Sequence, residues 1–172
     1  MPPAPASGPE GKASFLQIFP SIVLPMFIAV LDQTIVATAM PSIGHDLGDV
    51  TQLPWVVTAY LLAAVAVTPL YGKLSDIFGR RGIMLLAIST FVIGSVACAL
   101  SPSVPFLALA RGLQGAGGGG LISLAQTIIA DIVAPRERGR YQGYIASVFA
   151  ASSLAGPVLG GFLSEHIHWS AI

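Results

Sequence analysis

Five long apolar segments constrain this chain more than any other feature. A helix needs about 20 mostly apolar residues to cross the hydrocarbon core of a bilayer. Five stretches have roughly that length and character: residues 15–40, 54–71, 83–101, 104–129 and 143–163. Because these runs are continuously apolar rather than alternating, they predict helices and not the strands of a membrane barrel. The sequence therefore predicts an all-α, polytopic transmembrane helical bundle with five spans.

The overall composition leads to the same class. The chain is 54% hydrophobic and only 9% charged, whereas soluble domains carry roughly 25% charged residues. The net charge of zero argues against a nucleic-acid partner. Residues 1–12, rich in Pro, Ala, Gly and Ser, predict a disordered cytoplasmic tail. The single cysteine, Cys98, lies in an apolar run and is expected to be a small packed residue.

The basic residues predict the orientation of the spans. Seven of the eight Lys and Arg residues precede the first span or lie between spans two and three or between spans four and five. Cytoplasmic loops carry an excess of Lys and Arg. We therefore expect a multi-pass protein of the cell membrane, plasma or inner, with a cytoplasmic N-terminus and a chain that ends outside.

The segment between spans two and three carries a specific pattern. It resembles the signature loop G-x-L-S-D-x-x-G-R-R of the major facilitator superfamily of transporters. Seven positions match: Gly72, Leu74, Ser75, Asp76, Gly79, Arg80 and Arg81. The resemblance implies a transporter rather than an enzyme, with a lipid bilayer and a small-molecule substrate as its partners. It implies no bound cofactor, since the proton gradient would drive transport.

Two ionisable residues, Asp32 and Arg111, fall inside predicted spans. Such residues are costly in a bilayer, and they usually face a cavity or each other. At 1.5 Å rise per residue, both lie about 10–12 Å below the outer end of their spans, so they could pair. One reading is a fixed ion pair that only joins spans one and four. The other is that Asp32 is a proton site and Arg111 tunes its protonation.

The context of Asp32 favours the second reading. Residues 31–41 resemble the first-span motif L-D-x-T-V-V-N-V-A-L-P of the fourteen-span drug:proton antiporters in the same superfamily. The resemblance implies that Asp32 couples protons to transport, and it places Gln33 and Thr34 in a substrate cavity. Ala37 replaces the usual Asn, so that polar contact is not carried over.

Span four carries a further motif. Arg111 and Gln114 match R-x-x-Q-G-x-G, which is linked to proton transfer in this family. Gln114 lies one turn from Arg111, where it could order Arg111, touch substrate or only bond to another helix. Gly115, Gly117 and Gly120 also fit the G-x-G-x-x-G nucleotide fingerprint, but that motif needs a preceding strand. We expect these glycines to let another helix approach closely.

The charged residues between spans two and three predict a conformational latch. Asp76 could accept bonds from Arg80 and Arg81, and Asp131 at the end of span four lies close to them in the topology. A latch that forms in one state only would bias alternating access. The latch residues are expected to be Gly72, Asp76, Gly79, Arg80, Arg81 and Asp131, with Arg136 as a further candidate. The alternative is that these charges only set topology.

Span five resembles the antiporter motif G-x-x-x-G-P-x-x-G-G, with Ser152 in the first position. The matching residues are Gly156, Pro157, Gly160 and Gly161. A proline bends a helix and removes one donor. The resemblance implies that this glycine face packs on a helix of a second transporter domain, whereas the alternative is an ordinary proline kink.

These features lead to one expected organisation. Residues 13–172 would form an incomplete N-terminal transporter domain, a fragment whose second domain is missing. The complete protein would export drugs or other amphipathic molecules in exchange for protons. Two alternatives remain: a truncated, non-transporting remnant or membrane-associated helper, and a major facilitator carrier of another metabolite. The His residues have no metal-ligand spacing, so no metal site is expected.

Overall fold

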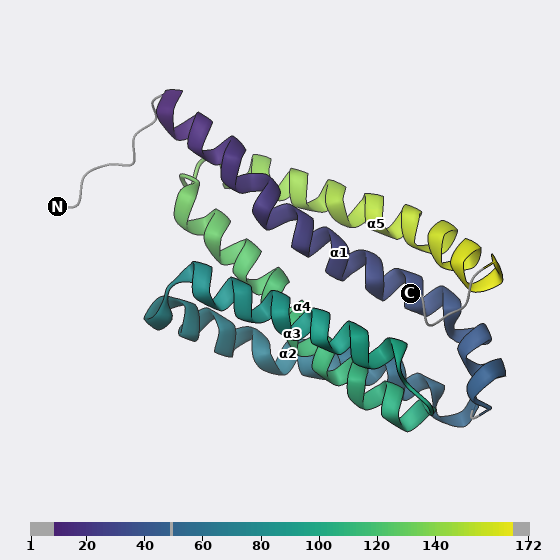
Figure 1. The fold of residues 1–172 in the computed structure, drawn as a ribbon. Coiled ribbons are helices and arrows are strands. Elements are labelled where there is room, and N and C mark those ends of the chain that lie inside the picture. The colour runs from purple at the N-terminus through teal and green to yellow at the C-terminus, as the bar shows by residue number, and fades with distance from the viewer. Residues whose placement is uncertain (1–8, 49, 167–172) are drawn as a thin grey trace.

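The fold is a bundle of five long helices. A computed structural model of the chain describes residues 9–48 and 50–166. Its elements, in order, are α1 (Pro9–Leu47), a short 3₁₀ turn η1 (Val50–Gln52), α2 (Leu53–Phe78), α3 (Arg80–Ala99), α4 (Val104–Ile132) and α5 (Arg138–His166). Figure 1 shows α1 and α5 side by side, with α2, α3 and α4 grouped next to them. The expected all-α bundle is confirmed.

Four of the helices extend beyond the predicted spans, whereas α3 begins three residues before its predicted span and ends two residues before that span ends. At 39 residues, α1 is about 58 Å long, well beyond the roughly 30 Å hydrocarbon core of a bilayer. It begins at Pro9, so residues 9–12 of the expected tail are helical, and residues 1–8 lie outside the described residues.

The expected loop between spans two and three is also mostly helix. Gly72 belongs to α2, which ends at Phe78, and α3 begins at Arg80. Gly79 alone separates the two helices, with φ of 87°. Only glycine adopts that conformation without a steric penalty, which explains the sharp turn at this position.

Four of the helices are long and apolar enough to cross a membrane: residues 20–47 of α1, the segment from η1 through α2, α3, and residues 138–163 of α5. Helix α4 was expected as a fifth such span. It is long enough to cross a membrane, but it is less apolar than the other four. Arg111, Gln114 and a run of glycines dilute its hydrophobic residues. They are tolerated because α4 is enclosed by other helices and buries residues along its whole length.

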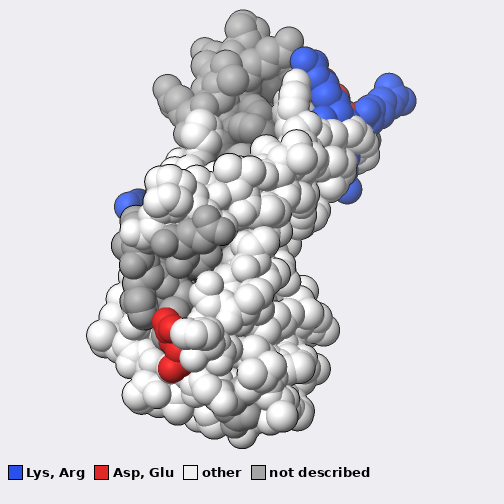
Figure 2. All heavy atoms as spheres, turned by 90° about the vertical axis from the view of Figure 1, so that its right-hand side faces the viewer, with Lys and Arg blue, Asp and Glu red and all other residues white. Residues whose placement is uncertain are grey.

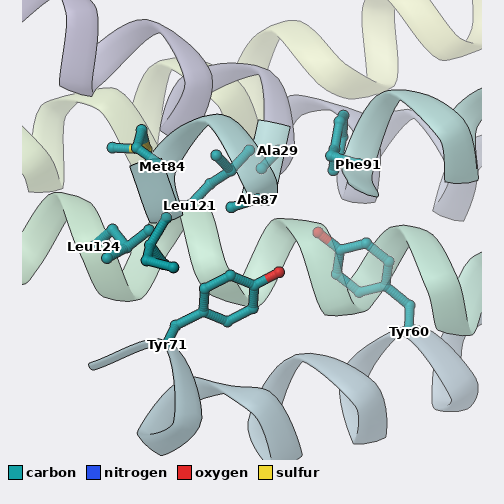
Figure 3. Packing of buried hydrophobic residues seen from close by; sticks show 9 residues of the cluster. Ala29, Tyr60, Tyr71, Met84, Ala87, Phe91, Leu121 and Leu124 are labelled. Atoms are coloured by element: carbon teal, nitrogen blue, oxygen red, sulfur yellow. The ribbon is translucent and has the colours of Figure 1, made fainter. Parts of the chain in front are cut away.

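Glycines decide how closely α2 and α3 approach α4. A Cβ atom at Gly115 would overlap the backbone of Tyr60, and one at Gly117 would overlap the backbone of Phe91. A Cβ at Gly120 would overlap the ring of Tyr71. Figure 3 shows Tyr60 and Tyr71 of α2 reaching toward α4, with Phe91 and Met84 of α3 opposite. The expected role of these glycines in close helix packing is confirmed.

Charged side chains are few on the surface. In Figure 2, most of the visible surface is uncharged; the visible Lys and Arg residues gather mainly at the upper right, and a small acidic patch lies at the lower left. Large apolar side chains are exposed along α2, α3 and α5, among them Val65, Ile93 and Leu154. Such a surface suits a lipid environment, because it offers water few polar groups.

Candidate functional site

The candidate site is centred on an ion pair between α1 and α4. Arg111 Nη1 donates to Asp32 Oδ2 at 2.7 Å, and the two side chains are only 2% and 10% exposed. The two residues were expected at matching depth, and the structure brings them into direct contact. A buried charge that lost its partner would be strongly destabilising, so the helices are held together at this point.

Gln114 connects the ion pair to α3. Its Nε2 donates to Asp32 Oδ1 at 2.9 Å and to Ser95 Oγ at 2.7 Å. Its Oε1 accepts from Arg111 Nη1 at 2.6 Å and from the Cys98 thiol at 3.5 Å. An amide offers two donors and two lone pairs, so this side chain is fully occupied. Of the roles considered for Gln114, the geometry favours ordering Arg111 and bonding between helices over contact with substrate.

Three residues of the site were not anticipated. Ser95 and Cys98 stand one turn apart on α3, a spacing that places them on one face, and this pairing was a usable sequence signal. Cys98 was expected to be plain packing, yet it contacts Gln114. No sequence pattern indicated Tyr60. Its ring lies against the guanidinium of Arg111, and the Cζ atom of Arg111 is 4.4 Å from the ring centre. Aromatic faces attract guanidinium groups most strongly where water is excluded.

A small cavity adjoins this network. It has a volume of about 30 Å³ and lies between α1, α3 and α4. Its polar lining comes from Asp32, Ser95, Cys98, Arg111 and Gln114, and apolar side chains of the same three helices complete it.

Gln33 and Thr34, which are predicted to line a substrate cavity, lie away from the small cavity beside Asp32. Thr34 Oγ1 lies 2.8 Å from the carbonyl oxygen of Leu31 and 3.2 Å from that of Ser152, so its side chain faces α5. Helical periodicity explains the difference, since residues two positions apart point to different sides of a helix. Gln33 is half-buried.

Two glycines of the α5 motif also pack against another helix of this bundle. A Cβ atom at Gly156 would overlap the side chain of Thr34, and one at Gly160 would overlap that of Thr38. These two glycines were expected to face a second domain, but they pack against α1 instead. A methyl group at Gly161 would meet no described atom within 4 Å, and Pro157 is exposed. Only these two residues of the motif remain on the open side of α5.

Three of the expected latch residues meet at the other end of the bundle. Arg80 bonds to Asp76 at 2.7 Å and to Asp131 at 3.0 Å, and it also donates to Ser75 Oγ. It therefore ties the α2–α3 junction to the end of α4. Arg81 is exposed and forms no ion pair in the described part of the chain. The expected cluster thus forms around Arg80 alone.

A further basic residue caps α4. Arg138 Nη2 donates to the carbonyl oxygen of Ala130 at 2.8 Å, and its Nε to that of Val133 at 3.4 Å. The last carbonyl groups of a helix have no partner within the helix, and they carry partial negative charge. Arg138 satisfies two carbonyl groups at this end and links α5 to α4, a role that the sequence did not indicate.

Comparisons with known proteins show which sequences this chain resembles. Residues 22–172 match the family model described as Major Facilitator Superfamily. The chain is 46% identical over 162 residues to the efflux pump dotC of Dothistroma septosporum, covering 93% of this chain and 28% of that protein. It is 36% identical over 168 residues to an MFS-type efflux pump of a Fusarium species, covering 98% of this chain and 30% of the relative.

A bacterial relative shows the same pattern of coverage. An uncharacterised MFS-type transporter of Mycobacterium tuberculosis is 41% identical over 152 residues, which is 88% of this chain and 22% of the relative. The chain therefore spans less than a third of the length of the curated relatives it matches.

Proposed function

Because the chain belongs to the Major Facilitator Superfamily, we propose that the complete protein exports drugs or other amphipathic small molecules in exchange for protons. The observation that carries this proposal is the buried network of Asp32, Arg111 and Gln114. A carboxylate paired with a buried guanidinium is costly to keep in a membrane, so such groups usually serve a pathway or a relay. The fungal relatives are named as efflux pumps, which supports export as the direction of transport.

Proton binding would act on the contact between α1 and α4. When Asp32 takes up a proton, its oxygen no longer carries the charge that attracts Arg111, and the ion pair at 2.7 Å weakens. A step that weakens one interhelical contact shifts the balance between two conformations. Inward movement of the proton would supply about 2.3 kcal/mol per 100 mV of membrane potential.

The Arg80 cluster would act as the latch of the same cycle. Arg80 joins Asp76 on α2 to Asp131 on α4. If the cluster forms in only one of the two transport states, it holds that state at the expense of the other. In such a cycle the Arg80 end of the bundle would face the cytoplasm, and the N-terminus would lie on the same side of the membrane.

The test is substitution of the proton site in the full-length protein. Asp32→Asn removes the titratable group and keeps the size, and it is expected to lower proton-driven export at least tenfold while the protein still reaches the membrane. Asp46→Asn, the same change at an exposed position, is the matched control and is expected to leave export within twofold. Export at a normal rate by Asp32→Asn would overturn the proposal.

A further inference from the structure

The side chain of Tyr60 is enclosed between α2 and α4. Its ring lies against the guanidinium of Arg111, and both side chains are buried (Figure 3 shows the ring reaching toward α4). A Cβ atom at Gly115 would overlap the backbone of Tyr60, and one at Gly118 would overlap its hydroxyl. Arg111, Gly115 and Gly118 are four and three residues apart, so they share one face of α4. The contact therefore lies inside this bundle and does not depend on the surfaces that the rest of the protein covers.

Hydrogen bonding does not account for the position of the ring. The Tyr60 hydroxyl is buried without a partner in the described part of the chain, which costs free energy. The face of an aromatic ring carries partial negative charge, and it attracts a guanidinium group that lies over it. The attraction to Arg111 is therefore the interaction that this position of Tyr60 supplies.

Arg111 has one anionic partner among the described residues. That partner is Asp32, 2.7 Å away, whereas Gln114, which accepts from the same nitrogen, is neutral. A proton on Asp32 would leave a buried guanidinium whose remaining partners are a neutral amide and the ring of Tyr60. A buried charge that has lost its ion partner is strongly destabilising. Any group that stabilises this state also makes the proton easier to bind.

The ring acts differently on the two states of Asp32. Its negative face attracts the guanidinium of Arg111 and repels the carboxylate that is bound to the same group. When Asp32 takes up a proton, an O–H bond forms, the carboxylate loses its charge, and only the attraction remains. The ring therefore stabilises the protonated state more than the ionised state.

We propose that Tyr60 is a positioning residue of the exchange site: its ring holds the charge of Arg111 while Asp32 carries a proton, and so sets the pH at which that proton is taken up. The inference rests on the proposed proton exchange and adds a second partner for Arg111. The ionisable groups around Asp32 are Arg111 of α4, Tyr60 of α2 and Cys98 of α3. Helix α5, on the other side of α1, has no ionisable residue at positions 145–164.

The infrared band of the carboxylic acid C=O stretch follows proton uptake by Asp32 without any substrate. The protein is the full-length chain in lipid nanodiscs, titrated across the pH range in which it stays folded. The band that disappears in Asp32→Asn belongs to Asp32, and the pH at which this band reaches half its full height is the midpoint. Because no substrate is present, the midpoint reports the groups around Asp32.

Tyr60→Leu removes the aromatic face, and the midpoint is expected to move toward acid by about half a pH unit or more, a roughly threefold loss of proton affinity. The sign follows because a less stable protonated state needs a higher proton concentration to form. Tyr60→Phe keeps the face and is expected to leave the midpoint unchanged. Tyr71→Leu makes the same change at another buried tyrosine of α2, which lies against Gly120 of α4, and it is also expected to leave the midpoint unchanged.

A second pair of variants tests the same contact without deleting the ring. Gly118→Ala places a methyl group where the Tyr60 hydroxyl lies, so the ring is displaced and the midpoint is expected to move toward acid. Adding Tyr60→Phe removes the hydroxyl and makes room for the methyl group, so the double variant is expected to regain the native midpoint. A role of Tyr60 in packing alone would lower the stability of these variants and leave the midpoint where it is.

The outcomes separate this inference from the proposed function. If no band is lost in Asp32→Asn, Asp32 takes up no proton, and both proposals are overturned. If the band is present and both Tyr60→Leu and Gly118→Ala keep the native midpoint, the role of Tyr60 is wrong and proton uptake at Asp32 stands. An equal shift in Tyr71→Leu would also overturn it, because loosening of the α2–α4 contact would then be the cause. If Tyr60→Leu does not fold, the Gly118 variants decide alone.

Discussion

The guanidinium of Arg111 lies over the ring of Tyr60, and the Cζ atom of Arg111 is 4.4 Å from the ring centre. Each residue also has one buried polar atom without a partner in the described part of the chain, Arg111 Nε and the Tyr60 hydroxyl. The ring, and not the hydroxyl, is therefore the part of Tyr60 that Arg111 uses.

This relationship predicts opposite results for two substitutions of Tyr60. Tyr60→Phe keeps the ring and removes a hydroxyl whose burial without a partner costs about 1–3 kcal/mol, so stability is expected to be equal or higher. Tyr60→Leu removes the aromatic face and is expected to lose about 2 kcal/mol or more. Thermal unfolding of the purified protein in detergent measures both. A Phe variant as unstable as the Leu variant would show that the hydroxyl has a partner.

The ion pair itself predicts non-additive losses. Asp32→Asn or Arg111→Gln alone leaves one buried charge unpaired, which typically costs about 3–5 kcal/mol. The double variant leaves no unpaired charge, so it is expected to be more stable than the sum of the two single losses implies. Unfolding of the three variants in denaturant gives the coupling energy. Strict additivity would mean that the pair in the structure is not formed in the membrane protein.

The contact between α1 and α5 predicts a difference between two glycines of the same motif. Gly156→Ala places a methyl group into the side chain of Thr34, so overpacking is expected to cost about 1–3 kcal/mol. Gly161→Ala places the same group in open space and is expected to be neutral. Thermal stability of the two variants decides this, and equal stabilities would place Gly156 on the open face after all.

The two neighbouring arginines at the α2–α3 turn give a further matched pair. Arg80→Gln breaks the contacts to Asp76 and Asp131, whereas Arg81→Gln changes an exposed side chain without a described ion pair. Partly exposed pairs are worth up to about 1 kcal/mol, so export by Arg80→Gln is expected to slow roughly fivefold. Export by Arg81→Gln should stay within twofold. Initial rates at saturating substrate measure both, and similar losses would favour a purely topological role for these charges.

Sequence alone determined the class of fold and the residues at the centre of the site. Apolar runs of membrane length leave the backbone no partner but itself, so the helices follow directly. The cost of placing Asp32 and Arg111 in an apolar run marked them as a pair before any contact was known. The glycines of α4 indicated close helix packing for a similarly local reason, the absence of a side chain.

Only the tertiary structure decided which neighbouring helix each face of a helix would contact. Periodicity gives the side of a helix on which a residue lies, but not which neighbour covers that side. Thr34 therefore faces Gly156 of α5, and α4 is enclosed enough to carry Arg111 and Gln114. The roles of Tyr60, Ser95 and Cys98 depend on distances between helices, which are set by packing across segments far apart in the chain.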